Sequence, residues 1–270
     1  MQCGISTACF YPTETREALR FLRSFHHGPT EIFLNTFSEL EESYLEQLKE
    51  IAQEHQLEIA SIHPFSSAFE PFLFFSSYEN RFLDGVELYK KFFHACNVLG
   101  AKVLVFHGDT RHRTIDMKLY AERFYRLSQI AQQEYGVILG QENVERCCCS
   151  NPENIRLLRE YTNDAVKFVL DVKQARRFGI SPFDVLSAMG AENVSHLHLS
   201  DAKGDKTCIT PGEGEFDFSK LFTELSKHNN LLSGVVELYN DNFESPQQLV
   251  AGTEFVNQHL KNHLKGGISI

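Results

Sequence analysis

The sequence predicts an α/β protein built as a (β/α)8 TIM barrel, and three observations support this fold. Short apolar runs alternate with longer amphipathic stretches along the 270 residues. Eight such runs occur, each followed by a helical pattern, over the length of about 250 residues typical of this barrel. No linker or compositional break divides the chain, so we expect residues 1–270 to form a single domain.

The apolar runs have the composition of parallel strands that are buried on both faces, because they are rich in Val, Ile, Leu and Phe. We expect strands at residues 2–7, 31–36, 58–64, 102–108, 137–143, 167–172, 194–201 and 234–240. An open, doubly wound sheet is the alternative. That fold usually has fewer strands, and no GxGxxG segment follows the first run here, so the barrel is favoured.

Helical patterns separate these strands. We expect helices at residues 14–25, 43–55, 80–99, 116–135, 152–161, 182–189, 218–228 and 246–264. The first follows Thr13, a residue type suited to an N-cap. Gly100 and Gly136 come directly after two of the helices, where glycine commonly ends a helix, and Pro152 opens a third.

Charge and hydropathy exclude several classes of function. Acidic residues outnumber basic ones by 36 to 26, for a net charge of -10. Such a surface repels phosphate backbones, so we expect no nucleic-acid partner. No apolar stretch reaches the roughly 20 residues that span a bilayer, so we expect no membrane association. No basic segment followed by an apolar run opens the chain, so we expect a cytoplasmic protein without a secretory signal.

The seven cysteines predict free thiols and not a disulfide framework. Their number is odd, and three of them (Cys147, Cys148 and Cys149) are adjacent, where disulfide geometry is unfavourable. The absence of a CxxC pair argues against a zinc site made of thiolates. Free thiols agree with a reducing compartment.

Ionisable residues collect at the ends of the predicted strands, where barrel enzymes carry their chemistry. Four of them end successive strands and should converge at one side of the barrel mouth: Glu142, Asp171, His198 and Glu237. The three carboxylates would repel one another unless a cation lay between them. Three oxygen ligands and one nitrogen suit Mn2+ or Mg2+, with Zn2+ and Co2+ as alternatives. His196 lies deeper in its strand, and we expect it to be structural.

Other polar and aromatic residues belong to the same rim. His63 and His107 end neighbouring strands and could bind substrate hydroxyls or relay protons, with a packing role as the equal alternative. Five phenylalanines within residues 65–75 could form an apolar lid or wall, or else a subunit contact. For Lys203 and Lys206 a solvated loop position is favoured over a phosphate site.

Five segments carry a resemblance to a known family: Gln141-Glu142-Asn143, Leu170-Asp171, His196-Leu197-His198-Leu199-Ser200-Asp201, Pro-Gly-Glu-Gly-Glu-Phe-Asp at 211–217, and Val236-Glu237. Together they resemble the xylose isomerase-like TIM-barrel superfamily, which includes the sugar phosphate isomerase/epimerase family. It contains sugar isomerases, ketose 3-epimerases, inosose dehydratases, hydroxypyruvate isomerase and endonuclease IV. The resemblance implies that the four residues bind one divalent metal and that Glu142 and Glu237 are catalytic. It also implies that His63, His107 and Gln174 lie near the substrate.

The same resemblance implies a metal-dependent isomerase or epimerase of carbohydrate metabolism. Its substrate would be a sugar, a sugar phosphate or a keto-polyol. The reaction would remove a proton next to a metal-bound carbonyl and pass through a cis-enediolate; dehydration is a further possible outcome. The resemblance also makes a homo-oligomer possible.

Departures from the family keep alternatives open. Gln174 stands where many relatives have a histidine, and an amide is a poor metal ligand. Ketohexose 3-epimerases usually carry an acidic residue where Cys148 lies, and an arginine where Gly204 lies. The alternatives are an endonuclease IV-like phosphodiesterase, which needs more histidines, and a non-catalytic sugar-binding barrel.

Overall fold

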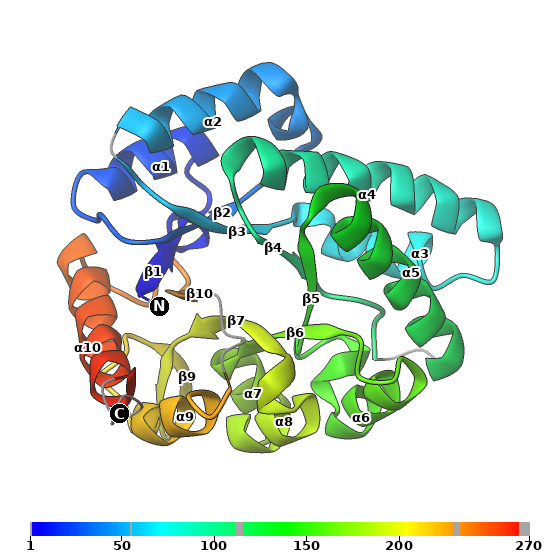
Figure 1. Cartoon of the computed structure of the whole chain (residues 1–270). Helices are drawn as coiled ribbons and strands as arrows, with labels where there is room; N and C mark the ends of the chain where they lie inside the picture. Colours follow the sequence, from blue (N-terminus) through cyan, green and yellow to red (C-terminus); the bar gives the residue numbers. More distant parts are fainter. Residues whose placement is uncertain (1, 55, 112–115, 229–232, 265–270) are drawn as a thin grey trace, which may run out of the picture.

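Eight parallel strands close into a barrel in the computed structural model, which confirms the predicted fold (Figure 1). The structure describes residues 2–54, 56–111, 116–228 and 233–264. The barrel strands are β1 (Cys3–Ser6), β2 (Thr30–Phe33), β3 (Ile59–His63), β4 (Val103–Phe106), β5 (Ile138–Glu142), β6 (Lys167–Asp171), β7 (Val194–Leu199) and β10 (Ser233–Val236). Each of them overlaps its predicted run.

The barrel closes between the first and the last of these strands. β1 pairs in parallel with β10, so that Cys3 lies opposite Gly234 and Ile5 opposite Val236. Around the rest of the barrel, neighbouring strands follow one another in chain order. Because all strands are parallel, their carboxyl ends meet at one face, and the polar residues that end them are brought together.

The eight predicted helices are all present around the barrel. They are α1 (Thr15–Arg23), α2 (Glu42–Glu54), α4 (Glu79–Leu99), α5 (Met117–Tyr135), α6 (Pro152–Tyr161), α8 (Pro182–Met189), α9 (Phe218–Leu225) and α10 (Pro246–Leu264). Gly100 and Gly136 end α4 and α5 in the left-handed conformation, with φ of 79° and 65°. The prediction for Thr13 was wrong, because the side chain of Glu14 caps α1 by accepting a hydrogen bond from the Glu17 backbone N–H.

The sequence analysis did not predict two short helices and a hairpin that the structure contains. The short helices α3 (Glu70–Leu73) and α7 (Val172–Phe178) lie directly after strand or loop residues, where a helical period is too brief to recognise. A two-stranded antiparallel hairpin, β8 (Asp201–Lys203) and β9 (Lys206–Ile209), follows β7. The carboxylate of Asp201 accepts hydrogen bonds from the backbone N–H groups of Gly212 and Gly214, both at 3.0 Å. Asp201 therefore anchors the glycine-rich loop at 211–217.

The core lies inside the barrel and between the barrel and its helices. Aromatic side chains fill much of the outer layer; Phe106, for example, lies 5.6 Å from Tyr89 and 5.4 Å from Phe124 between ring centroids. All seven cysteines are free and buried, which confirms that they are unpaired thiols. Helix α10 packs beside β1, so the last helix of the described chain lies against its first strand (Figure 1).

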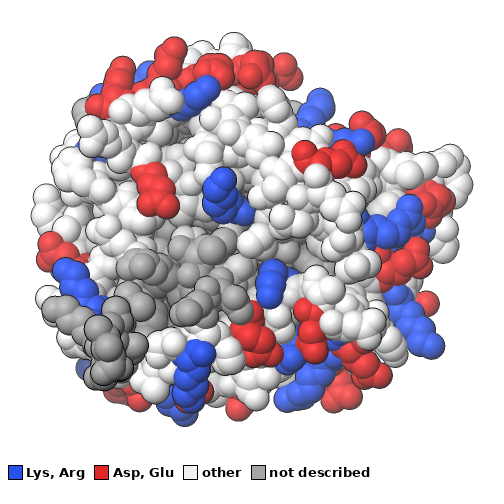
Figure 2. All heavy atoms as spheres, viewed as in Figure 1, with Lys and Arg blue, Asp and Glu red and all other residues white. Residues whose placement is uncertain are grey.

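The outer surface has mixed charge on the face drawn in Figure 2, where basic and acidic side chains are interspersed. Within the described ranges, the helices all fall short of the combined length and apolarity that crossing a bilayer requires.

Candidate metal centre

The structure brings the four candidate ligands together at the carboxyl ends of the strands. Glu142 and Asp171 are the last residues of β5 and β6, His198 lies in β7, and Glu237 directly follows β10. One ligand atom from each of the four lies within 4.8 Å of the others, and all four residues are buried. The register accounts for this convergence, because Asp171 lies opposite His198 in the β6–β7 pair.

One ring nitrogen of His198 faces all three carboxylates. Its Nδ1 lies 3.1 Å from Oε1 of Glu142, 3.6 Å from Oε2 of Glu237 and 3.9 Å from Oδ2 of Asp171. Burial opposes protonation of this ring, but the surrounding carboxylates outweigh burial and raise the pKa of His198 well above its usual value. The group is thus a concentrated site of negative charge that attracts a cation.

Asp171 provides a direct test of whether a metal ion fits. Its Oδ1 accepts a hydrogen bond of 2.9 Å from the Gln174 backbone N–H and so caps α7. Its Oδ2 is buried and has no hydrogen-bond partner. Burial, with the nearby charges of Glu142 and Glu237, raises the pKa of Asp171 to about 7. A buried carboxylate oxygen that makes no hydrogen bond and is directed at three other ligand atoms is what a divalent cation would satisfy.

Glu31 is a buried carboxylate that the sequence analysis missed, and it contacts the ring nitrogen of His198 that does not face the candidate metal position. Oε2 of Glu31 lies 3.1 Å from Nε2 of His198 and 3.2 Å from Nε2 of His196, and it accepts a hydrogen bond of 2.8 Å from Ser61. His196 is also 2.7 Å from the Ser233 hydroxyl. Glu31 therefore orients the His198 ring so that Nδ1 faces the candidate metal position. His196 belongs to this supporting network, in agreement with its expected structural role.

His63 and His107 lie beside the four ligands. Nε2 of His63 is 3.9 Å from Oε2 of Glu142 and 4.0 Å from Oε1 of Glu237. Nε2 of His107 is 3.7 Å from the same Glu142 oxygen. Burial and the neighbouring His107 lower the pKa of His63 to about 4, which favours a neutral imidazole that can accept or donate a hydrogen bond.

The orientation of His107 is set by Glu70, a second residue absent from the sequence-based predictions. Oε1 of Glu70 lies 3.0 Å from Nδ1 of His107, and Oε2 accepts hydrogen bonds from the backbone N–H groups of His107 and Gly108 at 3.0 and 2.6 Å. Tyr89 and Ser66 also donate to this carboxylate. Burial disfavours the His107 cation, but Glu70 outweighs this effect and raises the pKa of His107.

An ammonium group also lies in the centre. Nζ of Lys173 is 2.7 Å from Oε2 of Glu237 and 3.5 Å from Oδ2 of Asp171. Burial opposes the charged form, but the two carboxylates raise the pKa of Lys173 well above its usual value. Its position two residues after Asp171 was the only sequence signal that could have pointed to it.

A cavity of about 370 Å3 adjoins this group of side chains. Its walls are mostly apolar and aromatic, with a few polar groups at one side, as in many small-molecule sites. It is lined by Ala8, Tyr11, Phe33, Asn35, Phe65, Lys173, Glu237, Leu238 and Tyr239. Of the five phenylalanines at 65–75, Phe65 thus forms part of the wall, whereas Phe74 and Phe75 are buried in the core and Phe69 and Phe72 are exposed.

Gln174 is half-buried on α7 and is not among the residues that line this cavity. Its side-chain carbonyl accepts a hydrogen bond of 3.0 Å from the Glu145 backbone N–H. This bond ties α7 to the loop that follows β5.

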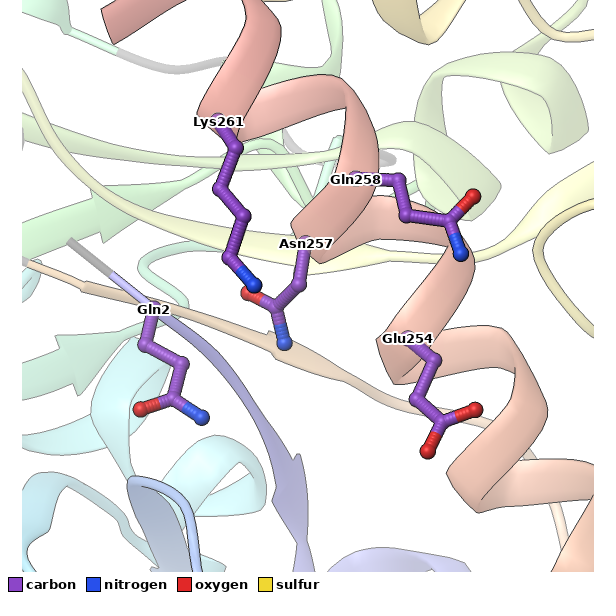
Figure 3. Close-up of a pocket in the computed structure, with 5 residues that line it drawn as sticks. All are labelled: Gln2, Glu254, Asn257, Gln258 and Lys261. Atoms are coloured by element: carbon purple, nitrogen blue, oxygen red, sulfur yellow. The ribbon is translucent and has the colours of Figure 1, made fainter.

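A larger cavity, of about 580 Å3, lies at the opposite end of the barrel, beside the start of β1. It is lined by Gln2 and, from α10, by Glu254, Asn257, Gln258 and Lys261 (Figure 3). Asn257 accepts a hydrogen bond of 2.8 Å from the Cys3 backbone N–H, which ties α10 to β1. In such barrels the carboxyl ends of the strands carry the chemistry, and the opposite end contributes to stability. The candidate site is therefore the cavity near Glu142.

The comparisons with known proteins agree with this architecture. The family model described as xylose isomerase-like TIM barrel matches residues 17–259. This protein belongs to the xylose isomerase-like TIM-barrel family. A comparison with proteins of curated function gives no match.

Solved structures with the same fold include several sugar epimerases. A D-tagatose 3-epimerase-like protein is 18% identical, with a TM-score of 0.75, over 99% of this chain and 100% of its own. The 3-keto-D-glucoside 4-epimerase from E. coli is 17% identical, with a TM-score of 0.70, over 97% and 99%. The IOLI protein, solved with a bound zinc atom, is 19% identical, with a TM-score of 0.69, over 98% and 97%. At these identities the likeness establishes the shared fold.

Proposed function

We propose that this protein is a metal-dependent sugar epimerase or isomerase. The observation that carries the proposal is the convergence of one imidazole nitrogen and three carboxylates beside an aromatic-lined cavity. The similar structures described as epimerases of tagatose type and of a keto-glucoside support a carbohydrate substrate, free or phosphorylated, or a keto-polyol.

Parallel pairing of β1 with β10 supports one domain over residues 1–270, and seven buried free thiols support a cytoplasmic protein.

The ligands in this proposal are Glu142, Asp171, His198 and Glu237, and the ion is Mn2+. Three carboxylates and one imidazole are a hard, oxygen-rich set, which suits Mn2+ or Mg2+ better than a softer metal. When bound, the ion would polarise the substrate carbonyl and make the adjacent C–H more acidic. Asp171 would serve as a ligand only, since its second oxygen already caps α7.

Glu142 and Glu237 would move the protons. They extend from strands that are not adjacent, and Nε2 of His63 lies between an oxygen of each, 3.9 and 4.0 Å away. One carboxylate would remove a proton from the carbon next to the carbonyl, giving a cis-enediolate. The other glutamate, protonated at the start, would give its proton to the opposite face of that carbon, which inverts it. For an aldose, return of the proton to the neighbouring carbonyl carbon would instead give a ketose.

The remaining polar groups would hold the substrate hydroxyls. His63 and His107 present their Nε2 atoms toward Glu142. Gln174 on α7 has an amide that would donate to a hydroxyl. The aromatic walls formed by Phe33 and Phe65 would pack against the apolar face of the sugar and exclude water.

Proton exchange with solvent tests the proposal. The protein is incubated with Mn2+ in D2O with a panel of ketoses, and deuterium incorporation at carbon is followed by NMR. We expect at least one sugar to gain deuterium next to its carbonyl and to yield an epimer or an aldose, and the reaction to stop on chelation by EDTA. Tight binding of a sugar with no exchange would instead identify a binding protein and overturn the proposal.

A further inference from the structure

Lys173 is the feature of this centre that the proposed chemistry leaves unexplained. Its side chain is 3% exposed, and it extends from the second residue of α7 into the group of carboxylates. Nζ contacts Oε2 of Glu237 at 2.7 Å, and that same oxygen lies 3.6 Å from Nδ1 of His198. The ammonium thus binds an oxygen that also faces the candidate metal position.

The second contact of Lys173 concerns another metal ligand. Nζ lies 3.5 Å from Oδ2 of Asp171, the buried oxygen that has no hydrogen-bond partner. Two of the four ligands therefore direct an oxygen toward the ammonium as well as toward the metal position. A positive charge this close reduces the attraction of both carboxylates for a second cation, because like charges repel strongly at short range in a buried site.

The environment of Lys173 also leaves room for the ammonium to move. It lines the 370 Å3 cavity, and it lies 4.8 Å from the centroid of the Tyr239 ring, whose face attracts a cation. Arg177 lies at the same distance from that ring. When an ion binds Glu237, the flexible stem of Lys173 can turn toward the cavity and keep its contact with the ring.

We propose that Lys173 competes with the divalent ion for Glu237 and Asp171, so that it weakens metal binding and stabilises the metal-free protein. This inference rests on the metal centre of the proposed function. It concerns the affinity of that centre and the stability of the chain, both of which are measured without a substrate.

The test compares Lys173→Met with Lys118→Met on the full chain. Methionine keeps much of the length of lysine and removes its charge, and Lys118 is an exposed lysine of α5, so both variants change the net charge equally. Mn2+ affinity of the metal-free proteins is measured by electron paramagnetic resonance at one pH. We expect Lys173→Met to bind Mn2+ roughly tenfold more tightly than the wild type, a change of the size that groups next to metal ligands usually cause. Lys118→Met should bind like the wild type.

Thermal unfolding supplies the second measurement. Metal-free Lys173→Met should unfold at a lower temperature than the wild type and regain that loss when Mn2+ is added, whereas Lys118→Met should follow the wild type in both states. If Lys173→Met does not fold without metal, Lys173→Gln keeps a donor for Glu237 and should show the same tighter binding.

Two results would overturn the inference and have different meanings. Equal or weaker Mn2+ binding by both Lys173 variants, with a wild type that binds, would show that the ammonium supports the metal site and does not compete with it. No binding of Mn2+ by any of the proteins would overturn the inference together with the metal centre of the proposed function.

Discussion

Glu70 and His107 are joined by two hydrogen bonds although 37 positions separate them in the sequence. The carboxylate accepts from the ring Nδ1–H and from the backbone N–H, both at 3.0 Å. With Nδ1 engaged in this way, Nε2 is left facing Glu142 at 3.7 Å. Glu70 therefore sets both the position of the ring and the nitrogen that it presents to the site.

Replacing Glu70 by glutamine tests that role. Glutamine has one acceptor oxygen where Glu70 has two, so at least one buried donor loses its partner. We expect turnover to fall roughly 10- to 100-fold, as for other groups that orient site residues, and the free energy of unfolding to fall by about 1–3 kcal/mol. Tyr89→Phe is the control, because it removes a donor to Glu70 without touching His107. Its stability should drop while its turnover stays near that of the wild type.

Glu31 should control the affinity of the metal centre through His198. Glu31→Gln replaces the carboxylate 3.1 Å from Nε2 and makes the ring a poorer ligand. We expect Mn2+ affinity, measured by calorimetry, to fall by roughly 10- to 100-fold. Glu39→Gln is matched to it, since Glu39 is also a buried carboxylate but accepts hydrogen bonds from the Asn35 backbone, Thr15 and Tyr44 and not from a histidine of the metal centre. Equal Mn2+ affinity in both variants would show that Glu31 does not influence metal binding.

The two proposed proton-transfer residues are tested by the smallest change that removes their charge. Glu142→Gln and Glu237→Gln should each abolish turnover, because an amide neither takes up a proton at carbon nor holds the ion well. Circular dichroism and thermal unfolding should show that the barrel survives. Wild-type rates of sugar deuteration in either variant would remove that glutamate from the proposed mechanism.

Gly108 should be intolerant of any side chain. Its φ is +91°, and a Cβ added there would lie 2.0 Å from the hydroxyl oxygen of Tyr120. Gly100 has a similar φ of +79°, but nothing lies within 4 Å of its added Cβ. In urea unfolding, Gly100→Ala should lose about 1 kcal/mol, the cost of the left-handed backbone. Gly108→Ala should lose about 3 kcal/mol or more, because overpacking adds to that cost.

The seven buried cysteines should react only slowly with thiol reagents in the folded protein. Burial raises the pKa of Cys3 and that of Cys9 to about 12, so both remain protonated thiols at pH 9. Because the thiolate is the reactive form, we expect Ellman's reagent to modify none of the seven quickly at pH 8, with little acceleration at pH 9. All seven should react in guanidinium chloride. A rapid native thiol would contradict the burial described for these residues.

How much was predictable is clearest from the residues at the strand ends. In a closed parallel barrel the carboxyl ends of all strands meet at one face, so strand order alone brings Glu142, Asp171, His198 and Glu237 to one side. Their convergence follows from local patterns, because each acid or imidazole ends an apolar run. The same reasoning placed His63 and His107 beside them.

The residues that support these ligands follow no such rule. Glu31 reaches His198 across the barrel from β2, a strand that does not pair with β7, and 167 positions separate the two residues. Glu70 extends from a single turn of helix after β3, and Lys173 from a helix that starts where β6 ends. The periodicity of the sequence thus determined the barrel and the residues at its mouth. Only tertiary packing decided which buried charges face one another, because pairing across the interior depends on the three-dimensional direction of each side chain and not on its spacing along the chain.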